Sequence, residues 1–218
     1  MGLSIWMALE LDMSIPKILF STFFLSCLSL SVYATVGGPQ HIEVLGLDQK
    51  AQKIYLMRHF EDGRARLPQL YYYQLNSTNP TTLIQVRSLY INPKTKLIDY
   101  DQESTQFDRE IAKIQKRLLL LQPIHNSNAS IQILTTKNGT AKAWYDPQEP
   151  IDKWTYQYRV KSFRLKSTLQ TAESYKQGLN ISRVYKVPHK NNMLVTVKYL
   201  GIPFEMGYTV EDPVLLTK

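Results

Sequence analysis

The sequence predicts an α+β fold: mainly antiparallel β-sheet, arranged as a meander plus hairpins, with one amphipathic α-helix packed on it. Short runs rich in Val, Ile, Leu and Tyr alternate with polar residues and are separated by turn-forming residues, the pattern of half-buried strands. Only residues 104–121 carry apolar side chains at the three- and four-residue steps of a helix. We therefore expect this helix to lie across the sheet and to close its core.

The chain begins with a segment that has the parts of a secretory signal. An apolar run at 18–30 follows Lys17 and precedes Ser-Val-Tyr-Ala at 31–34, which suits cleavage before Thr35. The run is shorter than the roughly 20 residues of a membrane-spanning helix, so we expect no transmembrane segment in the mature chain. The prediction is a protein exported to the periplasm or secreted, with residues 1–34 forming an N-terminal extension and a cleaved signal peptide.

Two alternatives concern the start of the chain and its anchoring. Glu10 and Asp12 are unusual ahead of a signal, so Met13 is an alternative start to Met1. Leu-Ser-Cys ending at Cys27 resembles part of a bacterial lipoprotein cleavage site, which makes lipid attachment the minor alternative to secretion.

Charge and cysteine content limit the function classes. The chain has 26 Lys and Arg against 18 Asp and Glu, a net charge of +8 that favours anionic partners. Cys27 is the only cysteine and lies in the expected signal, which excludes disulfides, a cysteine nucleophile and zinc–thiolate sites in the mature chain. Phosphate-binding Gly-rich loops, His-x-x-x-His pairs and Gly-x-Ser-x-Gly elbows are absent from the sequence, and we expect no cofactor and no metal.

The elements follow in order along residues 35–218, which we expect to form a single β-rich domain, with two sub-sheets joined near 101–125 as the finer possibility. The four strands of the meander are expected at 41–48, 53–60, 70–75 and 82–91. In the helix, one apolar stripe is expected from Phe107, Ile111, Ile114, Leu118 and Leu121, and Pro123 stops it.

The second half is expected to hold hairpins. Asn138-Gly139 predicts a type I′ turn between strands within 131–145. Alternation predicts a strand over 154–160 with its aromatic residues on the buried face, and a phase slip at Ser162-Phe163 predicts a bulge or a strong twist. The remaining expected elements are a short helix at 167–177, a hairpin pairing 185–187 with 193–199, and a strand at 204–216 interrupted by Pro213.

One short motif points to an enzyme. Residues 54–61 form an apolar strand that ends in Arg58-His59 and is followed by Glu61, which resembles the opening motif of the histidine phosphatase family. By that resemblance His59 is the phosphorylated nucleophile and Arg58 holds phosphate. Phe60 stands where the family has glycine, and the sequence after it reads as another strand rather than the family's helix. The simpler interpretation, which the sequence favours, is a solvated strand end and turn.

Two further clusters have both a binding and a structural interpretation. Alternating carboxylates at Asp99, Asp101 and Glu103 are typical of Ca²⁺ sites and of glycosidases, but their place before the helix favours capping of its start. Basic and aromatic residues interleave after Lys153, where a polyanion-binding strip competes with a core strand that has a solvated basic face. The candidate binding residues there are Trp154, Arg159, Lys161, Arg164 and Lys166.

The sequence thus favours an exported, non-enzymatic binding or interaction protein of the cell envelope, with a basic surface for an anionic envelope component or an acidic protein. Nucleic acid is not expected as a partner outside the cytoplasm. The competing hypotheses are an exported hydrolase with phosphatase-like chemistry at His59 and an inhibitor or immunity protein for an exported enzyme.

Overall fold

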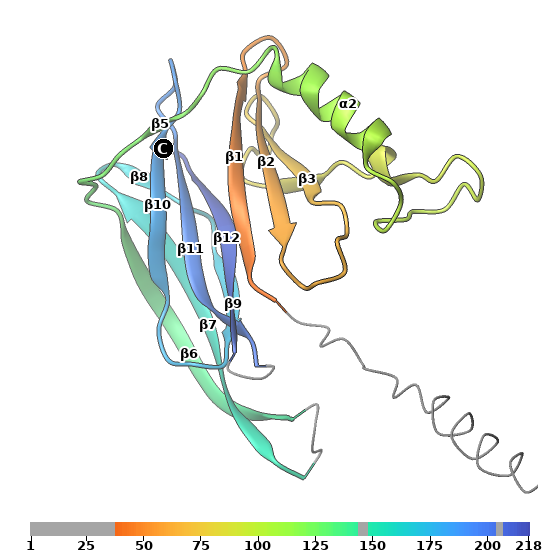
Figure 1. The fold of residues 1–218 in the computed structure, drawn as a ribbon. Coiled ribbons are helices and arrows are strands. Elements are labelled where there is room, and N and C mark those ends of the chain that lie inside the picture. The colour runs from red at the N-terminus through yellow and green to blue at the C-terminus, as the bar shows by residue number, and fades with distance from the viewer. Residues whose placement is uncertain (1–37, 144–147, 204–206) are drawn as a thin grey trace, which may run out of the picture. The chain divides into compact units, whose positions relative to one another are not determined.

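A computed structural model describes residues 38–143, 148–203 and 207–218, which belong to one compact unit. Within these ranges the protein is mostly β-sheet with one α-helix, which confirms a β-rich fold with predominantly antiparallel pairing (Figure 1). The elements are β1 (Gln40–Asp48), β2 (Lys53–Phe60), β3 (Gln69–Gln74), β4 (Leu83–Gln85), η2 (Ser88–Tyr90), α2 (Thr105–Gln115), β5 (Gln122–Pro123), β6 (Ser130–Lys142), β7 (Pro150–Ser162), β8 (Leu165–Lys166), β9 (Gln170–Ser174), β10 (Asn180–Lys186), β11 (Met193–Ile202) and β12 (Tyr208–Leu216).

The larger sheet has eight strands in the order β4-β3-β2-β1-β12-β11-β10-β5. Its one parallel contact joins β1 to β12 through the single register pair Gln40 and Val210, so the sheet is mixed rather than purely antiparallel. Away from this pair, a core cluster that includes Ile54, Leu194 and Leu215 packs between β1–β3 and β10–β12. Apolar burial between the two halves therefore replaces the missing ladder of backbone hydrogen bonds.

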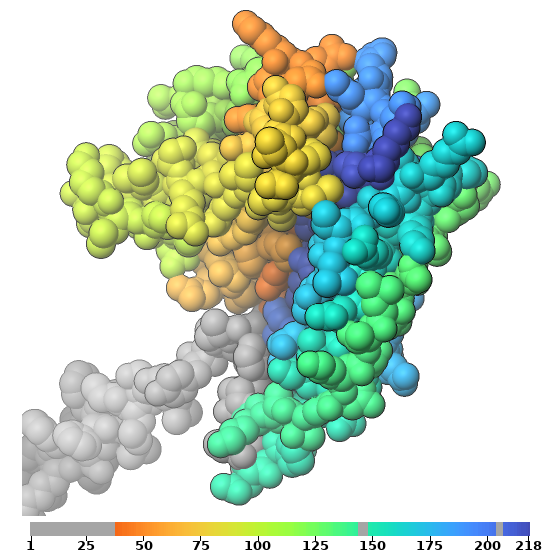
Figure 2. Space-filling model, turned by 180° about the vertical axis from the view of Figure 1, so that it is seen from behind, coloured from red at the N-terminus to blue at the C-terminus, as the bar shows by residue number. Residues whose placement is uncertain are grey.

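The smaller sheet packs on the β10–β12 half. Its strands β6 and β9 both pair with β7, and β8 pairs with the end of β7. The alternation predicted for β7 is present: Tyr156, Tyr158 and Val160 are buried against β10–β12. Seen from behind, β12 in dark blue lies at the boundary between β1–β4 and the smaller sheet (Figure 2).

The helix α2 covers the opposite half of the larger sheet, beside β1–β3 (Figure 1). It buries Phe107 and Ile111 in a cluster with Tyr55, Leu70 and Tyr90. It ends at Gln115, earlier than the predicted Leu121, because the chain turns so that Leu119 exchanges backbone hydrogen bonds with Leu47 of β1. The predicted strand at 82–91 is also shorter, with β4 followed by the 3-10 turn η2.

Three predicted local structures differ from those observed, because strand pairing outweighs local preference. Asn138 and Gly139 lie inside β6, paired with Trp154 and Lys153 of β7, and neither has the positive φ that a type I′ turn requires. Residues 167–177 contain the strand β9 instead of a helix. Residues 163–164 form a tight turn between β7 and β8, whereas the sequence predicted a bulge or a strong twist at 162–163.

The expected signal segment, including Cys27 and both alternative starts, lies outside the described residues. Within the described ranges, no helix has the length and apolar character that crossing a bilayer requires.

Candidate anion-binding cleft

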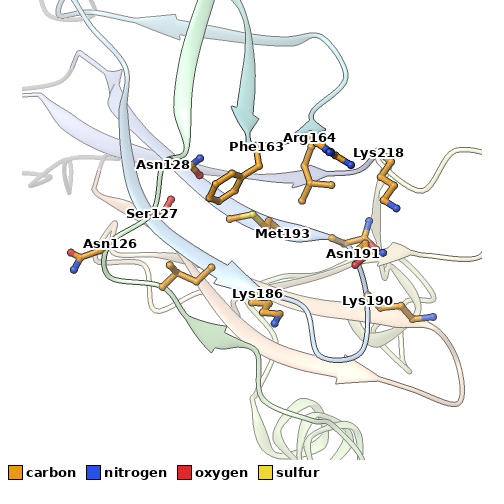
Figure 3. Close-up of a pocket in the computed structure, with 13 residues that line it drawn as sticks. Asn126, Ser127, Asn128, Phe163, Arg164, Lys186, Lys190, Asn191, Met193 and Lys218 are labelled. Atoms are coloured by element: carbon orange, nitrogen blue, oxygen red, sulfur yellow. The ribbon is translucent and has the colours of Figure 1, made fainter.

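A cleft of about 590 Å³ opens where the β7–β8 turn faces the turn that joins β10 to β11 (Figure 3). Its apolar lining includes Ile124, Leu165 and Met193, all of which also pack in the core between the two sheets. The cleft therefore opens toward the core between the two sheets. Its apolar floor excludes water from one side of a bound group.

Four cations surround this floor: Arg164, Lys186, Lys190 and Lys218. No salt bridge joins any of them to another described residue, and no Asp or Glu is among the residues that line the cleft. Unneutralised cations near a low-dielectric floor attract an anion more strongly than the same charges fully in water. The cleft has the charge and the surface chemistry of an anion-binding site.

Phe163 stands at the rim of the cleft in an unusual state. Its side chain is 88% exposed, and its backbone has a φ of 49°, in the left-handed region that bulky residues rarely adopt. Figure 3 shows its ring beside Met193, with Arg164 next along the turn. An exposed aromatic ring held in a strained backbone is a common feature of ligand-binding sites.

Buried and partly buried hydrogen bonds hold the segments on both sides of the cleft. The Ser162 hydroxyl and the Asn128 side-chain oxygen are 2.7 Å apart, and Ser167 Oγ accepts from the Val160 amide at 3.0 Å. On the other side, the Asn192 side-chain amide donates to the Leu216 carbonyl at 3.3 Å. The cations are thus carried on strand ends and short turns that the core fixes.

The binding residues predicted around β7 lie in three different places in the structure. Only Arg164 lines the cleft. Arg159, Lys161 and Lys166 lie on the outer face of the smaller sheet, where Lys161 and Lys166 are direct cross-strand partners. Trp154 is on the inner face and packs against the core, so it is separated from those cations by the sheet.

The residues of the motif that resembles the histidine phosphatase family are also separated in the structure, because alternate residues of β2 face opposite sides of the sheet. The His59 Nε2 atom lies 2.7 Å from a carboxylate oxygen of Glu43, and its ring stacks on His41 with centroids 4.7 Å apart. Arg58 is on the other side of β2, where it pairs with Asp212 at 2.6 Å. Glu61 pairs with His41 at 3.0 Å. This placement does not bring Arg58 and His59 to one phosphate.

The carboxylates before the helix have structural partners. Asp101 pairs with Arg64 at 2.9 Å, Asp99 accepts from the Asn92 side chain at 3.0 Å, and Glu103 accepts from the Thr105 hydroxyl at the start of α2. Among the residues that the structure describes, no group of three or more His, Cys, Asp or Glu is arranged to hold a metal ion.

No protein-family model, curated protein or solved structure gives a significant match to this chain.

Proposed function

We propose that this protein is an exported, non-enzymatic binding protein of the cell envelope whose cleft binds an anionic partner. One observation carries the proposal: Arg164, Lys186, Lys190 and Lys218 surround one apolar-floored cleft that no acidic residue lines. On most protein surfaces cations are interspersed with acids, and such unopposed charge costs stability through repulsion. An anionic partner would relieve that repulsion.

The chemistry of the cleft favours binding over catalysis. Its polar side chains other than the cations are amides and one hydroxyl, from Asn126, Ser127, Asn128, Asn191 and Asn192. These groups donate hydrogen bonds to an anion, but at neutral pH none is a general base, and the cleft contains no nucleophile paired with a base. The arrangement can hold an anion and has no evident means of transforming it.

Direct binding tests this function. We would measure the affinity for dextran sulfate, a soluble polyanion, with a variant that combines Arg164→Gln, Lys186→Gln and Lys190→Gln. Each exposed charge contact contributes about 0.2–1 kcal/mol, so loss of three should weaken binding by about 3- to 150-fold and reduce its dependence on salt.

The matched control removes three cations elsewhere, with Lys137→Gln, Lys142→Gln and Lys198→Gln, all at exposed strand positions away from the cleft. It lowers net charge by the same amount and should retain most of the affinity. Equal losses in the two triple variants would show that net charge, and not the cleft, determines binding.

Export is the second part of the proposal and is supported by the signal-like pattern at 17–34. In cells that make the full chain, we expect the protein in the periplasm or medium with Thr35 as its first residue. Protein that remains in the cytoplasm with an intact N-terminus would contradict export, and lipid on Cys27 would establish anchoring instead.

A further inference from the structure

The cleft belongs to a larger surface at one end of the sheets. Because β1 and β12 are parallel, the end of β1, the end of β12 and the β10–β11 turn all lie at this end (Figure 1). The segment from 116 to 129 runs along it, bridging to Leu47 and then pairing with β10. We call this surface the basic end; its segments are 49–52, 75–82, 116–129, 163–164, 187–192 and 217–218.

These six segments contain no Asp or Glu. Besides the cleft residues Arg164, Lys190 and Lys218, they carry Lys50 and Lys116, which are exposed. Their remaining charged residue is Arg117, which pairs with Asp48 at 2.6 Å; that carboxylate ends β1 and is itself buried. Cations from widely separated parts of the sequence therefore lie at one end with little compensating negative charge.

Large apolar side chains are exposed among these cations. Phe163 is 88% exposed, Leu120 is 77% exposed and Leu119 is 41% exposed. The backbone of Leu119 is fixed by reciprocal hydrogen bonds to Leu47, 2.8 and 2.9 Å long, so the exposure of Leu120 next to it is built into the fold. Figure 2 shows the 49–52 turn, the β10–β11 turn and the β8 region along the same rim.

We propose that the basic end docks on an anionic lipid surface, with Phe163 and Leu120 entering the headgroup layer and the surrounding Lys and Arg contacting lipid phosphates. This inference rests on the proposed function and assigns its anionic partner. Lipid is favoured over an acidic protein because lysine is depleted in protein–protein interface cores. Surfaces that bind anionic lipid instead mix Lys and Arg with inserted Phe, Trp and Leu.

Vesicle binding tests this inference with protein recovered from cells that make the full chain. The probes are phosphatidylcholine vesicles with and without phosphatidylglycerol. Lys50→Gln combined with Lys190→Gln should weaken binding to the anionic vesicles about 30-fold, at about 1 kcal/mol per charge. Phe163→Ser and Leu120→Ser should each weaken it about tenfold, through lost apolar burial.

Matched substitutions separate the basic end from general properties of the chain. Lys137→Gln with Lys198→Gln removes equal charge elsewhere, and Leu97→Ser removes an apolar side chain that is 69% exposed in the loop before α2. Both controls should bind anionic vesicles nearly as well as the unsubstituted protein. All variants share the same N-terminal segment, so its contribution cancels.

Dextran sulfate distinguishes failure of the lipid assignment from failure of the proposed function. If Phe163→Ser and Leu120→Ser leave vesicle binding unchanged while the cleft triple variant loses dextran sulfate binding, the protein binds anions through the cleft but does not dock on lipid through the basic end. Preference for an acidic protein over anionic vesicles would also overturn the lipid assignment. If the cleft variant retains dextran sulfate binding, the proposed function itself is wrong.

Discussion

The two ends of the larger sheet differ in whether their charged and polar side chains have partners within the fold. At the end where β1 begins and β2 ends, polar and charged side chains have partners within the fold: His41 with Glu61, His59 with Glu43, and Arg58 with Asp212. We call this the paired end. At the basic end, cations and apolar side chains lie exposed with almost no acid near them. The contacts of the paired end therefore join different strands of the fold, whereas the cations of the basic end, apart from Arg117, have no acidic partner among the described residues.

Arg58 shows how the paired end contributes to the fold. Its guanidinium contacts Gln40 of β1 as well as Asp212 of β12, and Asp212 also accepts from the Tyr199 hydroxyl of β11. Burial, with the Asp212 charge as a smaller cause, raises the pKa of Tyr199, so this hydroxyl stays a donor. The network joins the two halves of the sheet where β1 and β12 share only one register pair.

Glu211, which directly precedes Asp212 in β12, also contributes to this junction. Its carboxylate accepts from the Ile42 amide at 3.1 Å, from the Ser182 hydroxyl at 2.6 Å and from Arg183 at 2.9 Å. Arg183 also donates to the Ile42 carbonyl at 2.6 Å. These two side chains satisfy backbone groups of β1 that a neighbouring strand would otherwise pair, and an unpaired buried amide is costly.

The largest expected effect is therefore at Glu211, where Glu211→Gln removes the charge but keeps the shape. We expect it to lower the free energy of unfolding at neutral pH by about 2 kcal/mol, because the side-chain amide cannot accept all three hydrogen bonds. Arg183 is 43% exposed, so water compensates part of its lost partner. Urea denaturation measures the difference.

The effect of Glu211→Gln should depend on pH. Burial alone would raise the pKa of Glu211, but hydrogen bonds from Ser182, the Ile42 amide and Arg183 outweigh it and hold the pKa below the ordinary 4.5. A lowered pKa stabilises the fold above pH 4.5, and this contribution is lost as pH falls through the folded-state pKa. The destabilisation should therefore shrink in acid; a difference independent of pH would show that the carboxylate charge is not responsible.

Individual strands could be predicted from the sequence, whereas the pairing of distant strands could not. The strand β7 follows from alternation, because its buried and exposed residues alternate along the segment. The strands β1 and β2 follow from short apolar runs, which the structure buries over several consecutive residues. The prediction of a turn at Asn138-Gly139 is wrong because pairing of β6, which has 13 residues, with β7 outweighs the local preference of these two residues. The parallel contact of β1 with β12 involves segments about 170 residues apart and leaves no local pattern.

The cleft could be predicted only in part, since its residues come from separate segments. Arg164 was found through its neighbours on β7, whereas Lys186, Lys190 and Lys218 belong to segments that the fold alone brings to it. One available signal was the absence of any acidic residue from 116 to 145. The alternation that predicts β7 also places Trp154 on the opposite face from Arg159 and Lys161, because successive side chains of a strand point to opposite faces.

A smaller effect, of opposite sign, is expected at the basic end with Phe163→Asn. The left-handed backbone at position 163 costs a bulky residue about 1–2 kcal/mol, while Asn adopts it more readily. Because the ring is 88% exposed, little packing is lost, and we expect the free energy of unfolding to rise by about 1 kcal/mol in urea denaturation. Arg164→Asn, at a neighbouring position without positive φ, should not stabilise. A less stable Phe163→Asn protein would mean that the ring supports the fold; a more stable one would show that the fold tolerates strain to keep an aromatic side chain exposed at the rim of the cleft.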